Sequence, residues 1–209
     1  MIYLKILDNF LNKKDLEYLS KMSLEKVGEN DIKVYHNTID KFKIVKNSCI
    51  DKEKLIDLQN IYHNKAMEIL KELNPKKINL YDYSEFHIVE SGSKYKFPIH
   101  DDIPAKILSG VIYLEPEENK GTCFYETKDG QGIKEVKWKK NRAVFFSRKE
   151  RTTWHSFESD GKSNRIVLVY NLMTKDIKSV YKLENKSYLF GLLRSKINPY
   201  LHRYFNFVI

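Results

Sequence analysis

Cysteine and long apolar runs are both scarce in this chain. Only two of its 209 residues are cysteines, Cys49 and Cys123, which are too few for the disulfide framework of a small secreted domain. No apolar run approaches the roughly 18 residues of a transmembrane helix, and residues 1–6 lack the charged start and long apolar stretch of a secretion signal. We therefore expect a cytoplasmic protein without a membrane span.

Hydrophobic residues, by contrast, are abundant enough to build a core. They make up 42% of the chain, and aromatic residues make up 13%, which is typical of a globular rather than a disordered protein. The length suits one domain with a small extension. We predict a domain over residues 1–175, divided into a supporting part (1–77) and a catalytic core (78–175). An amphipathic helical extension follows over 176–209, and a helix packed on its own domain is the favoured interpretation there.

The formal net charge of +9 has two interpretations. A basic surface can bind nucleic acid or an acidic substrate, but runs of charge more often only keep a surface solvated. Lysine accompanies much asparagine, isoleucine and tyrosine, which share A/T-rich codons. We favour a solvated surface for the basic segment 128–151 and do not expect a nucleic-acid partner, while an acidic substrate remains open.

The pattern of apolar residues changes at about residue 78. Before it, a short strand over 1–10, a helix over 11–24 and a second helix over 51–73 are predicted, the last from apolar residues at three-to-four spacing. After it come short runs rich in Ile, Val, Tyr and Phe, separated by turn residues. This order predicts an α+β fold, namely a jelly roll (double-stranded β-helix) of about eight strands with the N-terminal helices on one outer face. The predicted strands cover 79–89, 95–99, 107–114, 122–127, 133–137, 143–147, 152–157 and 166–171.

Four polar residues in the second half suggest a chemistry. His100 and Asp102 lie where a predicted strand ends, and His155 lies on a later strand. Two histidines and one carboxylate on one face of an iron ion form the facial triad of non-haem Fe(II) oxygenases, which leaves the opposite face open for other ligands. Arg165 adds a fixed fork for the distal carboxylate of a 2-oxo acid.

Alternation along the last predicted strand places Arg165 on the same face as Val167 and Val169. We expect this face to line the interior, where an unpaired guanidinium is costly, so that a carboxylate ligand is its natural partner. We also expect the strands carrying His155 and Arg165 to pair as antiparallel neighbours across the turn at 159–163.

Three stretches of the chain resemble one family as a set. They are Tyr-Lys-Phe-Pro-Ile-His-Asp-Asp at 95–102, the segment 141–157 ending in Trp-His-Ser-Phe, and Asn-Arg-Ile-Val-Leu-Val-Tyr-Asn at 164–171. Residues 80–173 thus resemble the catalytic core of the Fe(II)/2-oxoglutarate-dependent dioxygenases, in particular the prolyl-hydroxylase-like branch.

The resemblance implies an oxidoreductase that uses Fe(II), 2-oxoglutarate and O2 to hydroxylate a C–H bond. His100, Asp102 and His155 would ligate iron, and Arg165 would bind the distal carboxylate of 2-oxoglutarate. Tyr113 is the candidate for a hydroxyl donor to that carboxylate, with Tyr83 and Tyr95 as alternatives whose packing in the sheet is favoured.

Other interpretations remain open beside this one. Asp101, between the two proposed ligands, is expected to be a solvated loop carboxylate. The resemblance favours a prolyl or other peptidyl substrate, but a small molecule such as an amino acid or nucleobase suits the same fold. A cupin-like metal-binding jelly roll with other chemistry is the alternative outside the family.

Overall fold

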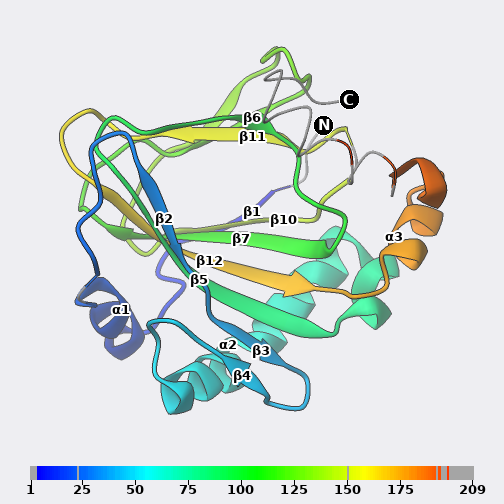
Figure 1. Cartoon of the computed structure of the whole chain (residues 1–209), viewed down its shortest axis with the longest axis horizontal. Coiled ribbons are helices and arrows are strands. Elements are labelled where there is room, and N and C mark those ends of the chain that lie inside the picture. Colours follow the sequence, from blue (N-terminus) through cyan, green and yellow to red (C-terminus); the bar gives the residue numbers. More distant parts are fainter. Residues whose placement is uncertain (1–3, 23, 150, 192, 194–196, 198–209) are drawn as a thin grey trace.

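Two antiparallel β-sheets face each other, and helix α2 packs on the outer side of the larger one in this computed structural model (Figure 1). The structure describes residues 4–22, 24–149, 151–191, 193 and 197. The predicted jelly roll with helices on one outer face is confirmed.

The larger sheet contains eight of the described strands. Their order is β1-β10-β7-β12-β5-β3-β4, and β2 also pairs with β5. The bounds are Lys5–Leu7 (β1), Ile32–Tyr35 (β2), Thr38–Asp40 (β3), Val45–Lys46 (β4), Tyr83–Ser91 (β5), Lys106–Glu115 (β7), Ala143–Phe146 (β10) and Arg165–Met173 (β12).

The smaller sheet contains four strands in the order β6-β11-β8-β9. These strands are Lys96–His100 (β6), Thr122–Tyr125 (β8), Lys134–Val136 (β9) and Trp154–Glu158 (β11). In Figure 1 this sheet lies above the larger one, with β6 and β11 side by side. The space between the two sheets is where the predicted site residues meet.

The helices follow recognisable local signals. Helix α1 (Lys13–Ser20) begins after Asn12, whose side chain accepts a hydrogen bond from the Asp15 amide. Helix α2 (Lys52–Leu73) ends at Asn74, because Pro75 opens the short 3-10 helix η1 (Pro75–Leu80). Helix α3 covers Ile177–Leu183. None of the described helices combines the length and apolar character that crossing a bilayer would require.

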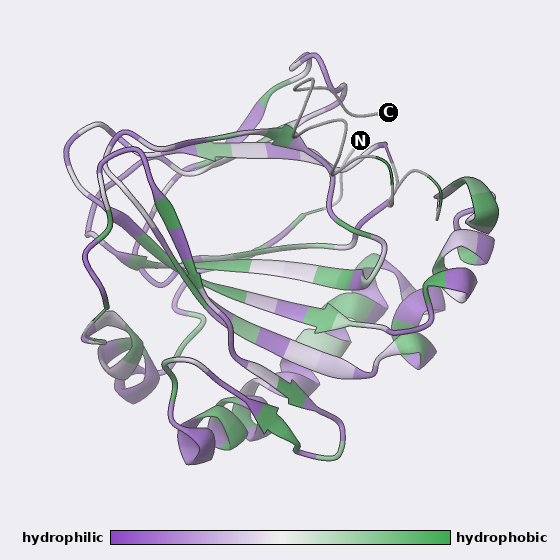
Figure 2. Ribbon diagram, in the orientation of Figure 1, coloured by the Kyte–Doolittle hydropathy of each residue, from purple (hydrophilic) through white to green (hydrophobic). Residues whose placement is uncertain are grey.

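The apolar side chains of strand β12 alternate between two hydrophobic cores, one on each face of the larger sheet. Leu168, Tyr170 and Leu172 pack toward α2, while Val167 and Val169 belong to the cluster between the sheets. Figure 2 shows hydrophobic and hydrophilic residues interleaved along α2, as expected for a helix with one buried face. The prediction that Arg165 shares the interior face with these valines is confirmed, since all three line the cavity between the sheets.

Several predictions about the elements were wrong. Strands β2, β3 and β4 were not predicted, and α1 is shorter than the helix expected over 11–24. The strands carrying His155 and Arg165 are not paired neighbours, because β11 belongs to the small sheet and β12 to the large one. The connection between them passes from one sheet to the other, so that the two side chains approach from opposite walls of the same cavity.

Candidate active site

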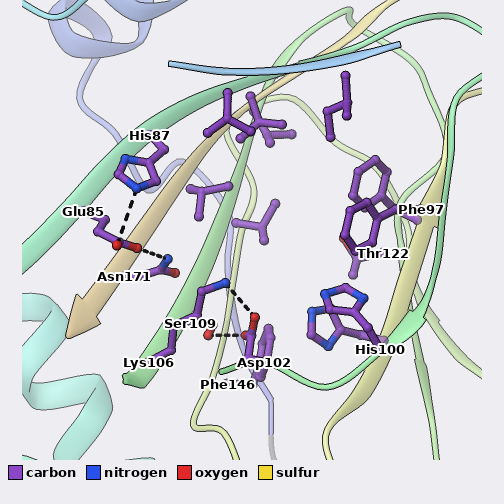
Figure 3. Close-up of a pocket in the computed structure, with 18 of the residues that line it drawn as sticks. Glu85, His87, Phe97, His100, Asp102, Lys106, Ser109, Thr122, Phe146 and Asn171 are labelled. Atoms are coloured by element: carbon purple, nitrogen blue, oxygen red, sulfur yellow. Dashed lines mark hydrogen bonds and ion pairs between the residues drawn. The ribbon is translucent and has the colours of Figure 1, made fainter. Parts of the chain in front are cut away.

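A cavity of about 230 Å³ lies between the two sheets (Figure 3). Its walls are mostly apolar, and both sheets contribute to them. The polar side chains that line it are Glu85, His87, His100, Asp102, Lys106, Ser109, Thr122, His155, Arg165 and Asn171. Polar side chains that converge in a cavity with a largely apolar surface are typical of a ligand site.

His100, Asp102 and His155 come together at one place in this cavity. One ligand atom from each residue lies within 4.8 Å of the others. His100 ends β6 and pairs directly with His155 of β11 across the small sheet, so their imidazole centroids are 4.1 Å apart. Asp102 follows in the loop after β6. Two histidines that are 55 residues apart in the sequence are therefore directly opposite each other on adjacent strands.

Both imidazoles are oriented by backbone carbonyl groups. His100 Nδ1 lies 3.0 Å from the Pro98 carbonyl oxygen, and His155 Nδ1 lies 2.9 Å from that of Thr153. A carbonyl oxygen only accepts, so each Nδ1 must carry the proton, which leaves each Nε2 lone pair for a metal. Burial, reinforced by His155, lowers the pKa of His100 to about 4, so its ring is neutral near pH 7.

Asp102 is held by two neighbours that the sequence did not single out. Ser109 donates a hydrogen bond of 2.5 Å to Asp102 Oδ2, and Lys106 donates one of 2.6 Å to Oδ1. Burial alone would raise the pKa of this carboxyl, but Lys106 and the two histidines outweigh burial and hold the pKa below its ordinary value. Asp102 is therefore an ionised carboxylate in a fixed position, which suits it to binding a metal ion.

Arg165 is a buried charge with unused hydrogen-bond donors. Its side chain is 1% exposed, and its Nε and Nη2 atoms are buried without a hydrogen-bond partner among the described residues. Aromatic rings surround it, with the guanidinium carbon 4.3 Å from the ring centroid of Phe157 and 5.2 Å from that of Trp138. Burial lowers the pKa of Arg165 to about 10, so it stays charged. Such a group suits a ligand carboxylate.

Tyr113 lies close to Arg165, but its hydroxyl already has protein partners. It donates to Thr122 Oγ1 at 3.0 Å and accepts from the Thr122 amide at 3.0 Å. Its ring centroid is 5.6 Å from the Arg165 guanidinium carbon, and it is not among the residues lining the cavity. Tyr83 and Tyr95 do not line the cavity either. A role for Tyr113 in binding 2-oxoglutarate stays a prediction.

The expectation that Asp101 is solvated was wrong. Its side chain is 4% exposed and accepts hydrogen bonds from the Thr153 hydroxyl (2.6 Å) and the Arg151 amide (2.8 Å). Arg148 lies 3.9 Å from it and donates to the backbone carbonyl of Asp102 at 2.9 Å. Asp101 thus connects the loop before His155 to the segment carrying the other two triad residues.

Part of the basic segment 128–151 forms ion pairs with acids of other segments. Lys139 and Arg142 pair with Asp8, and Lys140 pairs with Glu115. Arg148 departs from the expected solvated surface, because its side chain is 1% exposed. Its burial, like that of Asp101, depends on packing between distant segments, so no pattern in the sequence marks it.

The donor set fits a ferrous ion. Two imidazole nitrogens and one carboxylate oxygen on one side of a cavity are ligands of the 2-His-1-carboxylate type. The orphaned donors of Arg165 fit a dianionic 2-oxo acid. The residues present therefore suit both groups, and they were predicted from the sequence apart from Lys106 and Ser109. The i,i+4 spacing of Asp102 and Lys106 was the one local signal for the lysine.

Comparison with known proteins gives structural neighbours only. No protein-family model matches the chain, and no curated protein matches its sequence. A prolyl-4-hydroxylase from Pseudomonas putida superposes with a TM-score of 0.55 at 13% identity, covering 84% of this chain and 94% of that one.

Two further solved structures agree with this neighbour. An oxidoreductase of the 2OG-Fe(II) oxygenase family from Burkholderia pseudomallei has a TM-score of 0.56 at 13% identity, covering 81% of this chain and 84% of that one. A prolyl hydroxylase from Trichoplax adhaerens, solved with a hypoxia-inducible-factor peptide, has a TM-score of 0.54 at 12% identity, covering 85% and 86%. The chain therefore has the double-stranded β-helix fold of the 2OG-Fe(II) oxygenases.

Proposed function

We propose that this chain is an Fe(II)- and 2-oxoglutarate-dependent dioxygenase that hydroxylates a C–H bond. The observation that carries the proposal is Arg165. It lies buried with unpaired donors on the wall of a cavity that also holds three side chains suited to iron. A metal-binding jelly roll with other chemistry would have no use for such an arginine. The shared fold supports the same conclusion.

In this proposal His100, Asp102 and His155 hold the metal, and Arg165 binds the distal carboxylate of 2-oxoglutarate. When bound, iron and 2-oxoglutarate supply the activation of O2, with 2-oxoglutarate converted to succinate and CO2 and the substrate to its hydroxylated product. The protein orients the ligands through Pro98, Thr153 and Ser109. The apolar side chains of the cavity limit the access of water to the reacting carbon.

We propose a prolyl or other peptidyl side chain as the favoured substrate, with a small molecule as the alternative. The cavity volume supports a substrate whose reacting part is small. At about 230 Å³ it is below the roughly 300–1,000 Å³ of pockets for drug-sized ligands, and 2-oxoglutarate occupies part of it. One side chain of a peptide meets that limit, as does a compact metabolite.

The test uses purified protein without oxygen. Addition of Fe(II) and 2-oxoglutarate should give a charge-transfer absorption band, and admission of O2 should give succinate. Asp102→Ala should abolish both, while Asp57→Ala, on the exposed face of α2, should change neither. Absence of the band and of succinate in the unaltered protein would refute the proposal and leave a cupin-like metal protein as the better interpretation.

A further inference from the structure

The cavity contains a carboxylate for which the proposed roles have no use. Glu85 of β5 lines it together with the triad and Arg165, and its side chain is 15% exposed. Figure 3 shows Glu85 reaching into the cavity from the large sheet, beside His87 and Asn171 and across from Asp102. A charged group in such a position is costly unless a ligand or a neighbour compensates it.

The registers of the strands place Glu85 level with the triad. Asn171 of β12 pairs with Glu85 of β5. On its other side β12 pairs with β7, which carries Ser109, and Phe146 of β10 pairs with Ser109. The Gly110 amide lies 3.4 Å from Asn171 Oδ1 and connects the two pairs. Ser109, which holds Asp102, is therefore two strands away from Glu85, a separation of about 10 Å. Glu85 and the serine that holds Asp102 thus lie near each other on the wall of the same cavity.

Glu85 is ionised, and the groups in direct contact with it are an amide and an imidazole. Asn171 donates to Glu85 Oε2 at 2.8 Å, and His87 Nε2 lies 3.5 Å from Oε1. Burial alone would raise the pKa of Glu85, but the contacts with His87 and Asn171, together with the charge of Lys106, outweigh burial and lower the pKa. Among the residues that the structure describes, no lysine or arginine forms an ion pair with Glu85, whereas Asp15 and Asp102 each have a lysine partner.

Solvent reaches the cavity along β2. Val34 of β2 lines the cavity and is 38% exposed. The exposed His36 lies against His87, with 3.4 Å between its Nδ1 and His87 Nε2. His36 therefore brings an exposed side chain next to the His87 that contacts Glu85.

From this arrangement we infer that the substrate presents a cationic nitrogen, an ammonium or guanidinium group, to Glu85, and that the carbon to be hydroxylated lies a few bonds from that nitrogen. The inference rests on the proposed function. Two sources share this chemistry, namely a free amino acid or amine and a lysine or arginine side chain in a peptide. A prolyl residue within a peptide has no such charge, so the inference narrows the substrate class.

The experiment compares probes in pairs, in which one member carries the cation and the other is neutral. For the free source, L-proline and L-leucine are each compared with their N-acetyl forms. For the peptidyl source, Nα-acetyl-lysine N-methylamide is compared with its norleucine analogue, and N-acetyl-proline N-methylamide represents a neutral prolyl substrate. The unaltered protein receives Fe(II) and 2-oxoglutarate, and the readouts are succinate formation above the rate without probe and the change of the charge-transfer band.

We expect the cationic member of at least one pair to stimulate succinate formation tenfold or more over its neutral partner. The pair that responds identifies the source. Glu85→Gln, which keeps the shape and the contact with Asn171, should reduce that ratio at least tenfold. Glu90→Gln is the matched control, because Glu90 is a buried carboxylate on the same strand that accepts from Asn164 at 2.8 Å and does not line the cavity. It should leave the ratio unchanged.

Equal or stronger stimulation by the neutral members, or a ratio unaffected by Glu85→Gln, would overturn the inference. So would a lack of response to every cationic probe in protein that shows the charge-transfer band, in which case the proposed function would stand. Absence of the band in the unaltered protein would remove the proposed function and the inference together. If Glu85→Gln failed to fold, the ratios measured on the unaltered protein would still decide.

Discussion

The charged side chain of Arg165 is almost completely buried, at 1% exposure. Three aromatic rings lie around its guanidinium, and two of its nitrogens have no hydrogen-bond partner among the described residues. A buried unpaired charge destabilises the folded chain and is compensated only when a ligand binds. Arg165 is therefore expected to lower the stability of the ligand-free fold while raising the affinity for a carboxylate ligand.

Replacing Arg165 with methionine should separate these two effects. The ligand-free protein should melt at an equal or higher temperature, because an apolar side chain replaces an uncompensated charge. Affinity for 2-oxoglutarate should fall about 100-fold or more, since charge-assisted hydrogen bonds contribute roughly 1.5–3 kcal/mol each. Calorimetry and titration of the charge-transfer band measure the two quantities.

Arg142→Met provides the control for that comparison. Arg142 pairs with Asp8 outside the cavity, so its loss should leave 2-oxoglutarate affinity unchanged. A ligand-free Arg165→Met protein that is clearly less stable than the unaltered chain would show that the protein, rather than a ligand, satisfies Arg165.

Helix α3 is tied to the site by buried charges. Glu184, which caps its C-terminal end, accepts hydrogen bonds from Lys77 and Arg148, both at 2.7 Å, and all three side chains are at most 5% exposed. Arg148 in turn holds the backbone carbonyl of Asp102. The division of the chain at residue 175 stays a prediction, and residues 198–209 of the expected helical extension lie outside the described part. The network nevertheless connects residue 184 with the core.

Glu184→Gln should destabilise the fold by about 3–5 kcal/mol, because two buried cations lose a carboxylate partner. Glu158→Gln removes a carboxylate from an exposed pair with Lys96 and Lys120 and should cost only about 0–1 kcal/mol. Urea unfolding gives both values. Metal affinity should fall with the first variant and not with the second. Similar costs for both variants would contradict a buried role for Glu184.

Helix α2 contains a histidine that should make stability depend on pH. Burial lowers the pKa of His63, whose ring packs 4.6 Å from that of Tyr81. Its folded pKa lies below the unfolded value of about 6.5, so the folded state disfavours the proton. The stability it contributes is fully present above pH 6.5 and is lost as the pH falls toward the folded pKa.

The comparison of His63→Gln with the unaltered chain isolates this effect. The difference in unfolding free energy between pH 8 and pH 5 should be smaller in the variant, because the carboxylates that also titrate are common to both proteins. Urea unfolding at the two pH values measures it. An equal difference in both proteins would show that His63 titrates alike in the folded and unfolded states.

For the molecule as a whole, both proposed ligands should stabilise the folded state. Mn(II), which supports binding without turnover, and 2-oxoglutarate should together raise the melting temperature. Each ligand at 100 times its dissociation constant contributes about 2.7 kcal/mol. Asp102→Ala should abolish the response to Mn(II). An unchanged melting temperature in the unaltered protein would argue against a metal site between the sheets.

The candidate site residues were easier to predict from the sequence than the pairing of the strands. Candidate site residues with characteristic chemistry, such as His100, Asp102 and Arg165, could be identified from their type, order and spacing. Helix α2 could be identified because its apolar period extends over 22 residues. Strand pairing could not, since alternation reveals which face a residue takes but not which strand lies beside it.

Buried charge was the other feature that the sequence concealed. Glu85, Asp101 and Arg148 resemble ordinary surface residues among many lysines and acids. Each has a partner from a distant segment, such as Asn171 for Glu85, Thr153 for Asp101 and Glu184 for Arg148. Only the assembled fold shows that each faces a cavity or a network.

The direct pairing of His100 with His155 has a consequence for how this chain tolerates change. Two proposed metal ligands are set by the alignment of β6 with β11, not by the shape of a loop. Insertions in the connections between these strands leave the imidazoles opposite each other as long as the ladder keeps its alignment. A slip of one residue turns one imidazole to the opposite face of the sheet. Length variation among natural relatives should therefore collect in the connections and be absent from the two strands.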